Sequence, residues 1–349
     1  MTPDDDASPI NDAAQPDDSE VPQPPPLPPG SKSPEDYLLD EWLTLEHTDH
    51  HPDFRAGYVA FIGKANVGKS TQKNGLLDEK VAIISPKPQT TREKQLGILT
   101  TEQAQIIFVD TPGIHLPRTK LGDYMVASAQ SAIPDADVLL FLVDVSEVPN
   151  AADIAIAERV EQAAQRPETI AILVLNKADL LDEDNQTSLI ASYTDLVPNA
   201  EPLLMSAKSC DKCDTLLEMI IAGLPHGPRY YPAAQLTDSA ERENAAEMIR
   251  EQALILLEKE VPHSIAVQVE EYKQRKKGTL YIRAVIYVER DSQKGIVLGK
   301  GGAMLKQIGA AAREELQTIL GQKVYLDLWV KVLKNWRKDP DALRRLGYN

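Results

Sequence analysis

The sequence of 349 residues is long enough for about two domains, and its 42% hydrophobic content is sufficient for buried cores. No apolar run approaches the ~20 residues of a membrane-spanning helix. No basic segment followed by an apolar one opens the chain, so we expect neither a transmembrane segment nor a secretory signal. Two cysteines exclude a disulfide framework and fit a reducing compartment.

The net charge of −16 is distributed unevenly along the chain. Residues 1–50 carry a net charge of −12, residues 51–228 carry −9, and residues 229–349 carry +5. Only the last region has the sign expected of a nucleic-acid-binding domain. Residues 1–50 are rich in Asp, Pro and Ser, a composition that buries too little apolar surface to offset the entropy of ordering. We therefore predict a disordered, acidic, proline-rich head.

Residues 57–223 alternate between strand-like and helix-like patterns. This alternation predicts an α/β domain with a mostly parallel sheet and helices on both faces, and the glycine-rich loop described below makes it a domain of the P-loop NTPase type. Ligands of such sheets bind at the carboxyl ends of the strands. The predicted strands are 58–62, 104–109, 138–143, 169–175 and 202–205, and the predicted helices are 71–77, 121–133, 151–164, 185–196 and 215–222.

One glycine-rich loop stands between the first predicted strand and the first predicted helix. It fits the pattern G-x-x-x-x-G-K-[ST], whose backbone N–H groups cradle phosphates at a helix N-terminus. Lys69 is expected to reach the β- and γ-phosphates, and the Ser70 hydroxyl to hold Mg²⁺. The predicted phosphate-binding residues here are Gly63, Lys64, Ala65, Asn66, Val67, Gly68, Lys69, Ser70 and Thr71.

A second motif, Asp110-Thr111-Pro112-Gly113, directly follows an apolar strand. An acidic side chain at this strand end would hold Mg²⁺ through water, and the N–H of Gly113 would contact the γ-phosphate and move when it is lost. An Asp-x-x-Gly sequence alone is weak, because it occurs by chance in many proteins. Its place after the glycine-rich loop is what predicts that these four residues bind nucleotide.

Two motifs at the ends of later strands select the base. A carboxylate can accept both the N1–H and the N2–H₂ groups of guanine, a pair of donors that adenine lacks, and Asp179 is the predicted acceptor. Lys177 would lie over the base plane, Asn176 would tie the loops together, and the Ala207 N–H would meet guanine O6. The fourth motif comprises Ser206, Ala207 and Lys208. Four motifs in this order predict a guanine-nucleotide-binding domain with GTP or GDP and Mg²⁺ as its ligands.

The loop 85–92 contains two prolines and two threonines, which suits a mobile segment with a hydroxyl that joins Mg²⁺ when γ-phosphate is present. Thr91 is the predicted ligand and Thr90 the second choice; the alternative is an ordinary surface loop. Ile114 stands where Ras-like enzymes place a water-orienting Gln, so hydrolysis is expected to be slow or to rely on another group. The predicted catalytic residues are Asn66, Lys69, Thr91 and Gly113.

A linker rich in proline and glycine, residues 224–240, separates this domain from a second one at residues 241–349. The second domain is predicted to have a helix at 241–257, a strand pair at 264–270 and 279–289, a helix at 303–320 and a strand at 323–330, which is an α+β pattern. The sequence Gly299-Lys300-Gly301-Gly302 precedes the later helix. Its glycines would admit a sugar–phosphate backbone, and Lys300 would add positive charge.

Taken together, residues 57–349 resemble the Era family of bacterial ribosome-assembly GTPases. The motifs that carry the resemblance are 63–70, 85–92, 110–113, 176–179 and 206–208 in the first domain, and 230–232, 260–264, 294–302, 326–332, 335–337 and 343–348 in the second. The match is specific because two unrelated modules occur in the expected order. Asn66 also resembles the asparagine by which some related GTPases recruit a monovalent cation, which predicts K⁺ as a further cofactor.

The resemblance implies that the second domain is a type II KH domain whose G-x-x-G loop clamps single-stranded RNA. The implied RNA is the 3′ end of small-subunit rRNA, and the implied role is a GTP-hydrolysing switch in assembly of the small ribosomal subunit. The predicted RNA-binding residues are Ile296, Gly299, Lys300, Gly301 and Gly302, with Val297 beside Ile296 in the floor of the groove. We expect a cytoplasmic monomer. Peripheral membrane association is a further alternative, through Trp329, Trp336 and the basic residues Lys331, Lys334, Arg337 and Lys338.

The chain departs from the family after Thr71, where Gln72-Lys73 replaces a leucine pair that packs under the sheet. A buried lysine without a partner is costly. Either this helix is rotated or frayed, or Lys73 extends to solvent, or the chain binds nucleotide poorly. The last outcome would make it an RNA-binding assembly chaperone with weak or absent nucleotide binding.

A C-x-x-C pair, Cys210 and Cys213, follows the fourth motif. Zinc would need four ligands, and the sequence has no second pair. A redox switch beside the guanine pocket is one interpretation. An unreactive pair in a loop is favoured over it, because no thioredoxin-like context surrounds these cysteines.

Overall fold

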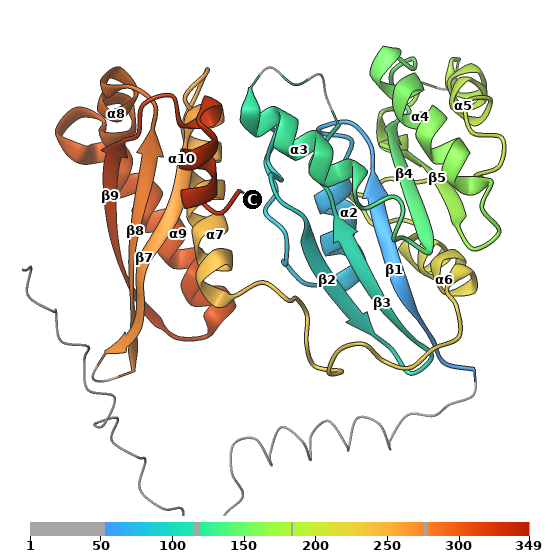
Figure 1. Cartoon of the computed structure of the whole chain (residues 1–349), viewed down its shortest axis with the longest axis horizontal. Helices are drawn as coiled ribbons and strands as arrows, with labels where there is room; N and C mark the ends of the chain where they lie inside the picture. The colour runs from blue at the N-terminus through green and yellow to red at the C-terminus, as the bar shows by residue number, and fades with distance from the viewer. Residues whose placement is uncertain (1–52, 115–116, 118, 183, 276–277, 349) are drawn as a thin grey trace, which may run out of the picture. The chain divides into compact units, whose positions relative to one another are not determined.

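The structure is a computed structural model that describes residues 53–114, 117, 119–182, 184–275 and 278–348. The predicted acidic head, residues 1–50, lies outside these residues. The described residues belong to one compact unit, which contains two sheets with their helices (Figure 1). Among the described residues, no helix is both long and apolar enough to cross a membrane.

The first sheet has six strands in the order β2-β3-β1-β4-β5-β6. Its neighbours pair in parallel except β2 and β3, which are antiparallel. The sequence pattern does not predict β2, because this short edge strand is only half-buried and Gly97 interrupts its apolar run. The strands are β1 (Arg55–Ile62), β2 (Gln95–Thr100), β3 (Ala104–Asp110), β4 (Val138–Asp144), β5 (Ile170–Asn176) and β6 (Glu201–Leu204).

Helices cover both faces of this sheet. Successive side chains of a strand point to opposite faces, so Val59 of β1 packs into one hydrophobic cluster with Leu76 and Leu216, whereas Ala60 packs into another with Ile156. The predicted mostly parallel sheet with helices on both faces is confirmed. The helices of this half are α2 (Lys69–Leu77), α3 (Lys120–Gln130), α4 (Ala151–Ala164), α5 (Gln186–Thr194) and α6 (Cys213–Gly223).

The second sheet has three strands in the order β7-β8-β9, with β7 antiparallel and β9 parallel to β8. A parallel pair needs a crossover, and here the crossover runs through α8 and α9. The G-x-x-G sequence lies between those two helices, at the end of the sheet where β8 finishes. The elements are α7 (Glu241–Leu256), β7 (Ala266–Arg275), β8 (Thr279–Val288), α8 (Asp291–Leu298), α9 (Ala303–Leu320), β9 (Lys323–Val332) and α10 (Pro340–Arg345).

The C-terminal residues pack against α3. Trp336 is fully buried in a cluster with Leu121 and Leu343, and its indole N–H donates to the Ser264 carbonyl at 2.9 Å. The Arg92 guanidinium lies over the Trp336 ring. Trp336 is therefore a core residue, and the predicted role of its side chain at a membrane surface is wrong.

Glu93 makes the free energy of unfolding depend on pH. Burial, together with the nearby carboxylates of Glu247 and Glu243, raises the pKa of Glu93 to about 7, against the opposing charges of Arg250 and Arg92. The folded chain holds this proton up to a higher pH than the unfolded chain, so the stabilisation is complete below pH 4.5 and is lost as the pH rises through 7. We expect Glu93→Gln to add about 1–2 kcal/mol to the free energy of unfolding at pH 8 and almost nothing at pH 5.

Urea unfolding at the two pH values measures this difference. Glu314→Gln changes an exposed carboxylate and serves as the control, with no expected pH-dependent gain. An equal gain from Glu93→Gln at both pH values would show that the side chain acts through packing and not through its proton.

Candidate functional site

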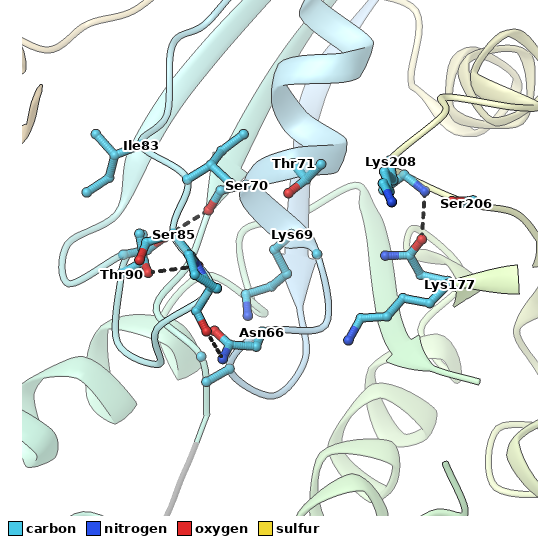
Figure 2. Close-up of a pocket in the computed structure, with 18 of the residues that line it drawn as sticks. Asn66, Lys69, Ser70, Thr71, Ile83, Ser85, Thr90, Lys177, Ser206 and Lys208 are labelled. Atoms are coloured by element: carbon cyan, nitrogen blue, oxygen red, sulfur yellow. Dashed lines mark hydrogen bonds between the residues drawn. The ribbon is translucent and has the colours of Figure 1, made fainter. Parts of the chain in front are cut away.

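All four sequence motifs of the first domain meet at one cavity of about 680 Å³, at the carboxyl ends of the strands. In Figure 2, Lys177 and Lys208 lie on one side of this cavity and Ser70 and Thr90 on the other. The lining residues are Ala65, Asn66, Gly68, Lys69, Ser70, Thr71, Ile83, Ile84, Ser85, Pro86, Gln89, Thr90, Thr91, Gly113, Asn176, Lys177, Asp179, Leu180, Ser206, Ala207 and Lys208.

The glycine-rich loop is shaped by two close approaches. Gly68 has φ of 103°, and a Cβ there would lie 2.3 Å from the side-chain nitrogen of Asn176, so only glycine fits. The Lys69 ammonium turns back and donates to the carbonyls of Gly63 at 3.1 Å and Lys64 at 2.8 Å. Burial lowers the pKa of Lys69 to about 8, although Asp110 opposes the shift. The result is a cationic loop that opens helix α2, which suits a phosphate group.

Three hydroxyl and carboxylate groups converge beside this loop. Ser70 Oγ lies 2.9 Å from Thr91 Oγ1 and donates to Asp110 Oδ2 at 2.7 Å, while Thr91 Oγ1 donates to the same oxygen at 3.4 Å. Asp110 Oδ1 is buried and has no hydrogen-bond partner among the described residues. Thr90 instead donates to the Lys87 carbonyl at 2.7 Å. Oxygen donors of this kind, with one buried carboxylate oxygen unused, fit Mg²⁺.

Asn176 joins the phosphate end of the cavity to the base end. Its amide nitrogen donates to the Val67 carbonyl at 2.7 Å, and its oxygen accepts from the Ala207 N–H at 2.7 Å. Ser206 Oγ donates to Asp179 Oδ1 at 2.6 Å, which leaves Asp179 Oδ2 available to a ligand in the described structure. These bonds hold the predicted base-binding carboxylate beside the fourth motif.

Several predicted residues support the cavity without lining it. The Val67 side chain is buried in the core, the Lys64 ammonium pairs with Asp153 at 2.7 Å, and Thr111 Oγ1 donates to the Phe61 carbonyl at 2.5 Å. The predicted residues outside the lining are Gly63, Lys64, Val67, Asp110, Thr111 and Pro112. Three apolar lining residues were absent from the predicted set, namely Ile83, Ile84 and Leu180. Their position directly beside Ser85 and Asp179 was the available signal.

Gly113 brings the second motif against the glycine-rich loop. A Cβ at Gly113 would lie 2.5 Å from the Ala65 backbone nitrogen, so no larger residue fits without a shift. The next residue, Ile114, donates its N–H to the Gly63 carbonyl at 3.2 Å. Residues 115, 116 and 118, which follow this motif, lie outside the described residues.

Gln72 and Lys73 are both fully buried in a regular α2, so the helix is neither rotated nor frayed and Lys73 does not extend to solvent. Gln72 Nε2 donates to Cys213 Sγ at 3.4 Å, and the Lys73 ammonium lies 4.0 Å from Asp110 Oδ2.

Cys213 forms a disulfide with Cys210. The favoured prediction, an unreactive pair of cysteines in a loop, did not include this bond. The C-x-x-C spacing was its signal in the sequence.

The second candidate site is the G-x-x-G loop. Gly299, Gly301 and Gly302 all have positive φ, of 69°, 61° and 82°, and Lys300 is exposed. A Cβ at Gly299 would lie 2.8 Å from the backbone of the following helix. Ile296 on α8 is 51% exposed. This arrangement offers backbone, one cation and one apolar side chain to a ligand.

Val297 does not take part in this surface. It is fully buried in the core of the second domain, so its predicted place in the floor of the groove is wrong. Ile296 and Val297 are consecutive on a helix and point in different directions, and only Ile296 faces out.

Two family models match the chain. The model described as 50S ribosome-binding GTPase matches residues 58–177, and the model described as KH domain matches residues 260–337. GTPase Era of Heliobacterium modesticaldum is 44% identical over 295 residues, which cover 84% of this chain and 97% of that protein. GTPase Era of Lacticaseibacillus paracasei is 48% identical over 302 residues, which cover 86% of this chain and 98% of that protein.

The chain belongs to the Era family of GTPases. A crystal structure of Era in complex with MgGDPNP and nucleotides 1506-1542 of 16S ribosomal RNA matches this Era-family chain with a TM-score of 0.79 and 41% identity, covering 84% of it and 99% of that structure. Aquifex aeolicus Era bound to GDP.AlF4-, as a point variant, matches with the same TM-score, identity and coverage. The predicted family, the P-loop GTPase fold with a KH domain and the GTPase activity are thus confirmed.

Proposed function

We propose that this Era-family GTPase is a GTP-hydrolysing switch that grips the 3′ end of small-subunit rRNA during assembly of the small ribosomal subunit. The observation that carries the proposal is the presence of a cavity lined by all four guanine-nucleotide motifs and a glycine-rich RNA-type loop within one compact unit. A solved Era bound to MgGDPNP and to 16S rRNA nucleotides supports it. We propose domain limits of 57–223 for GTP binding, 224–240 for the linker and 241–349 for the KH domain with its basic tail.

In this proposal Ser70 and Thr91 would hold Mg²⁺ through their hydroxyl oxygens and Asp110 would hold it through water, and the ion would supply Lewis-acid charge at the phosphates. Lys69 exchanges its bonds to loop carbonyls for bonds to phosphate oxygens. Asp179 accepts from the guanine edge. Because Thr91 belongs to the loop 85–92 and bonds the other two residues, loss of the γ-phosphate would release that loop.

RNA binding in its two nucleotide states tests the switch. We expect a labelled RNA with the sequence of the 16S 3′ end to bind about tenfold more tightly with GDPNP than with GDP, since a coupling of this size is typical of two-site switches. A shuffled RNA of equal length is the control. Equal affinity in both nucleotide states would contradict the switch, and equal affinity for both RNAs would contradict the assigned RNA.

We further propose that Asn66 recruits K⁺ beside the phosphates. Its amide nitrogen donates to the Pro86 carbonyl at 3.0 Å, which leaves Oδ1 for a cation. A cation there would stabilise the transition-state charge that an arginine finger otherwise meets. GTP hydrolysis is expected to be at least about tenfold faster in KCl than in NaCl. The Asn66→Ala variant should lose this difference, and equal wild-type rates in both salts would remove K⁺ from the mechanism.

The alternative is an RNA-binding assembly chaperone with weak or absent nucleotide binding. Buried Gln72 and Lys73 favour it, because they stand where the family resemblance implies an apolar pair that packs under the sheet. Lys73 has a carboxylate partner, however, which favours the switch. Binding of labelled GDP to the purified chain, compared with Gln72→Leu/Lys73→Leu, separates the two: binding by the double variant alone would establish the chaperone.

We place the protein in the cytoplasm as a monomer, where its ribosomal partner assembles. Peripheral membrane association would rest on Trp329, which is 55% exposed, and on nearby Lys331 and Lys334. Cosedimentation with anionic vesicles tests it, with Trp329→Ala expected to reduce the bound fraction.

A further inference from the structure

Lys73 is a buried lysine next to the proposed metal site; burial lowers the pKa of its ammonium, and the charges of Asp110 and Asp238 oppose that shift. Its side chain has no exposed surface, and its ammonium donates to the Gln95 carbonyl at 3.3 Å. The ammonium lies 4.0 Å from Asp110 Oδ2, the oxygen that accepts from Ser70 and Thr91.

The position of this ammonium is determined by packing. The aliphatic stem of Lys73 crosses β2 at Gly97, where an added Cβ would lie 3.3 Å from Lys73 Cδ and 2.7 Å from Leu77 Cδ1. The absence of a side chain at Gly97 therefore leaves a channel for the stem. A lysine side chain that follows this channel therefore places its ammonium beside Asp110 and not in solvent.

We propose that Lys73 is a positioning residue that takes over part of the electrostatic role of Mg²⁺, so that this GTPase binds guanine nucleotides with reduced dependence on the metal. The inference rests on the proposed nucleotide and Mg²⁺ site. It concerns the contact between Lys73 and Asp110. The four nucleotide motifs do not predict this contact, and a leucine at position 73 could not make it.

Two effects follow from the charge of the ammonium. Without metal, the Asp110 carboxylate repels the nucleotide phosphates, and Lys73 offsets this repulsion. With metal, the ammonium repels Mg²⁺ from the same carboxylate. Lys73 therefore strengthens metal-free nucleotide binding and weakens Mg²⁺ binding to the nucleotide complex, and the two effects oppose each other when Mg²⁺ is saturating.

The test compares the full-length chain with Lys73→Leu and Lys73→Met, the second of which keeps an unbranched stem. Fluorescent GDP is titrated in EDTA and in saturating Mg²⁺, and free Mg²⁺ is titrated into the GDP complex. In EDTA we expect each variant to bind GDP about tenfold more weakly than the native chain. The GDP complex of each variant should be half-saturated at about tenfold lower Mg²⁺, and GDP affinities at saturating Mg²⁺ should differ by less than about threefold.

Gln72→Leu is the matched control, because it changes the neighbouring buried polar residue of α2 without changing charge. It should leave unchanged both the GDP affinity in EDTA and the Mg²⁺ concentration that half-saturates the GDP complex. A purely structural role for Lys73 would move the melting temperature of the variants but not their Mg²⁺ dependence, and that result would overturn the inference. Binding of GDP only by the Lys73 variants would also overturn it. Binding of GDP by none of the chains would overturn the proposed function itself.

Discussion

Replacing Asp179 by asparagine is expected to weaken GDP binding at least about a hundredfold and to shift the base preference from guanine to xanthine. Asp179 offers two acceptor oxygens, one of which already accepts from Ser206 Oγ at 2.6 Å. Guanine needs an acceptor for each of two N–H donors, and an asparagine amide would set N–H against N–H. A buried polar group left unpaired in this way costs a factor of about 10²–10⁴ in recognition. Xanthine carries a carbonyl where guanine has its amino group, so the amide nitrogen can donate to it.

Competition between labelled GDP and unlabelled GDP, xanthosine diphosphate or ADP measures the preference. Asp182→Asn is the matched control, since Asp182 is exposed and lies three residues further along the chain outside the cavity lining. Asparagine can still accept from Ser206, so the loop should keep its shape. Unchanged GDP affinity in Asp179→Asn would mean that this carboxylate does not read the base.

The second large effect is expected at the G-x-x-G loop. Replacing Lys300 and Gly301 together by aspartate should weaken binding of the 16S 3′-end RNA by at least about 30-fold, because a phosphate contact is lost and two negative charges face the RNA backbone. Gly301 has φ of 61°, a conformation that aspartate adopts at a small cost, and an added Cβ there meets nothing within 4 Å. Titration of fluorescent RNA measures the loss.

Two controls make this result specific to the loop. Lys323→Asp changes an exposed lysine at the start of β9, opposite the start of β8 and therefore at the other end of the sheet from the loop. It should weaken RNA binding by less than about threefold. GDP affinity should be unchanged in both variants. A similar loss of RNA affinity in Lys323→Asp would indicate non-specific attraction by the basic domain and not a clamp at the glycines.

Local sequence determined much of the nucleotide site. The conformation of residues 63–70 depends mainly on residues close to them in the sequence. The pattern alone therefore predicts this loop at the start of α2. The predicted helix at 151–164 agrees with α4, because Asn150 supplies a side-chain cap at its first residue. The order of four motifs at strand ends also indicated one shared cavity, since parallel strands bring their carboxyl ends to one edge.

Contacts between distant segments decided the rest. In the sequence, Trp336 lies among the basic residues of the C-terminal tail, but in the structure it is buried against α3. The sequence predicts Val297 beside Ile296 in a groove, but the orientation of α8 places the Val297 side chain in the core. Strand β2 has too weak a pattern to be predicted by itself, and its pairing with β3 is what orders it.

Lys73 shows the division most clearly. The sequence by itself determined the family, the fold and a lysine where an apolar residue belongs, and it left three outcomes open for that lysine. Only the tertiary structure placed its ammonium 4.0 Å from Asp110, which is distant in the chain and arrives through the pairing of β1 with β3. Patterns in the sequence record the period of an element and the chemistry of a loop. The partner of a buried charge depends on which strands lie side by side, and that is a property of the whole fold.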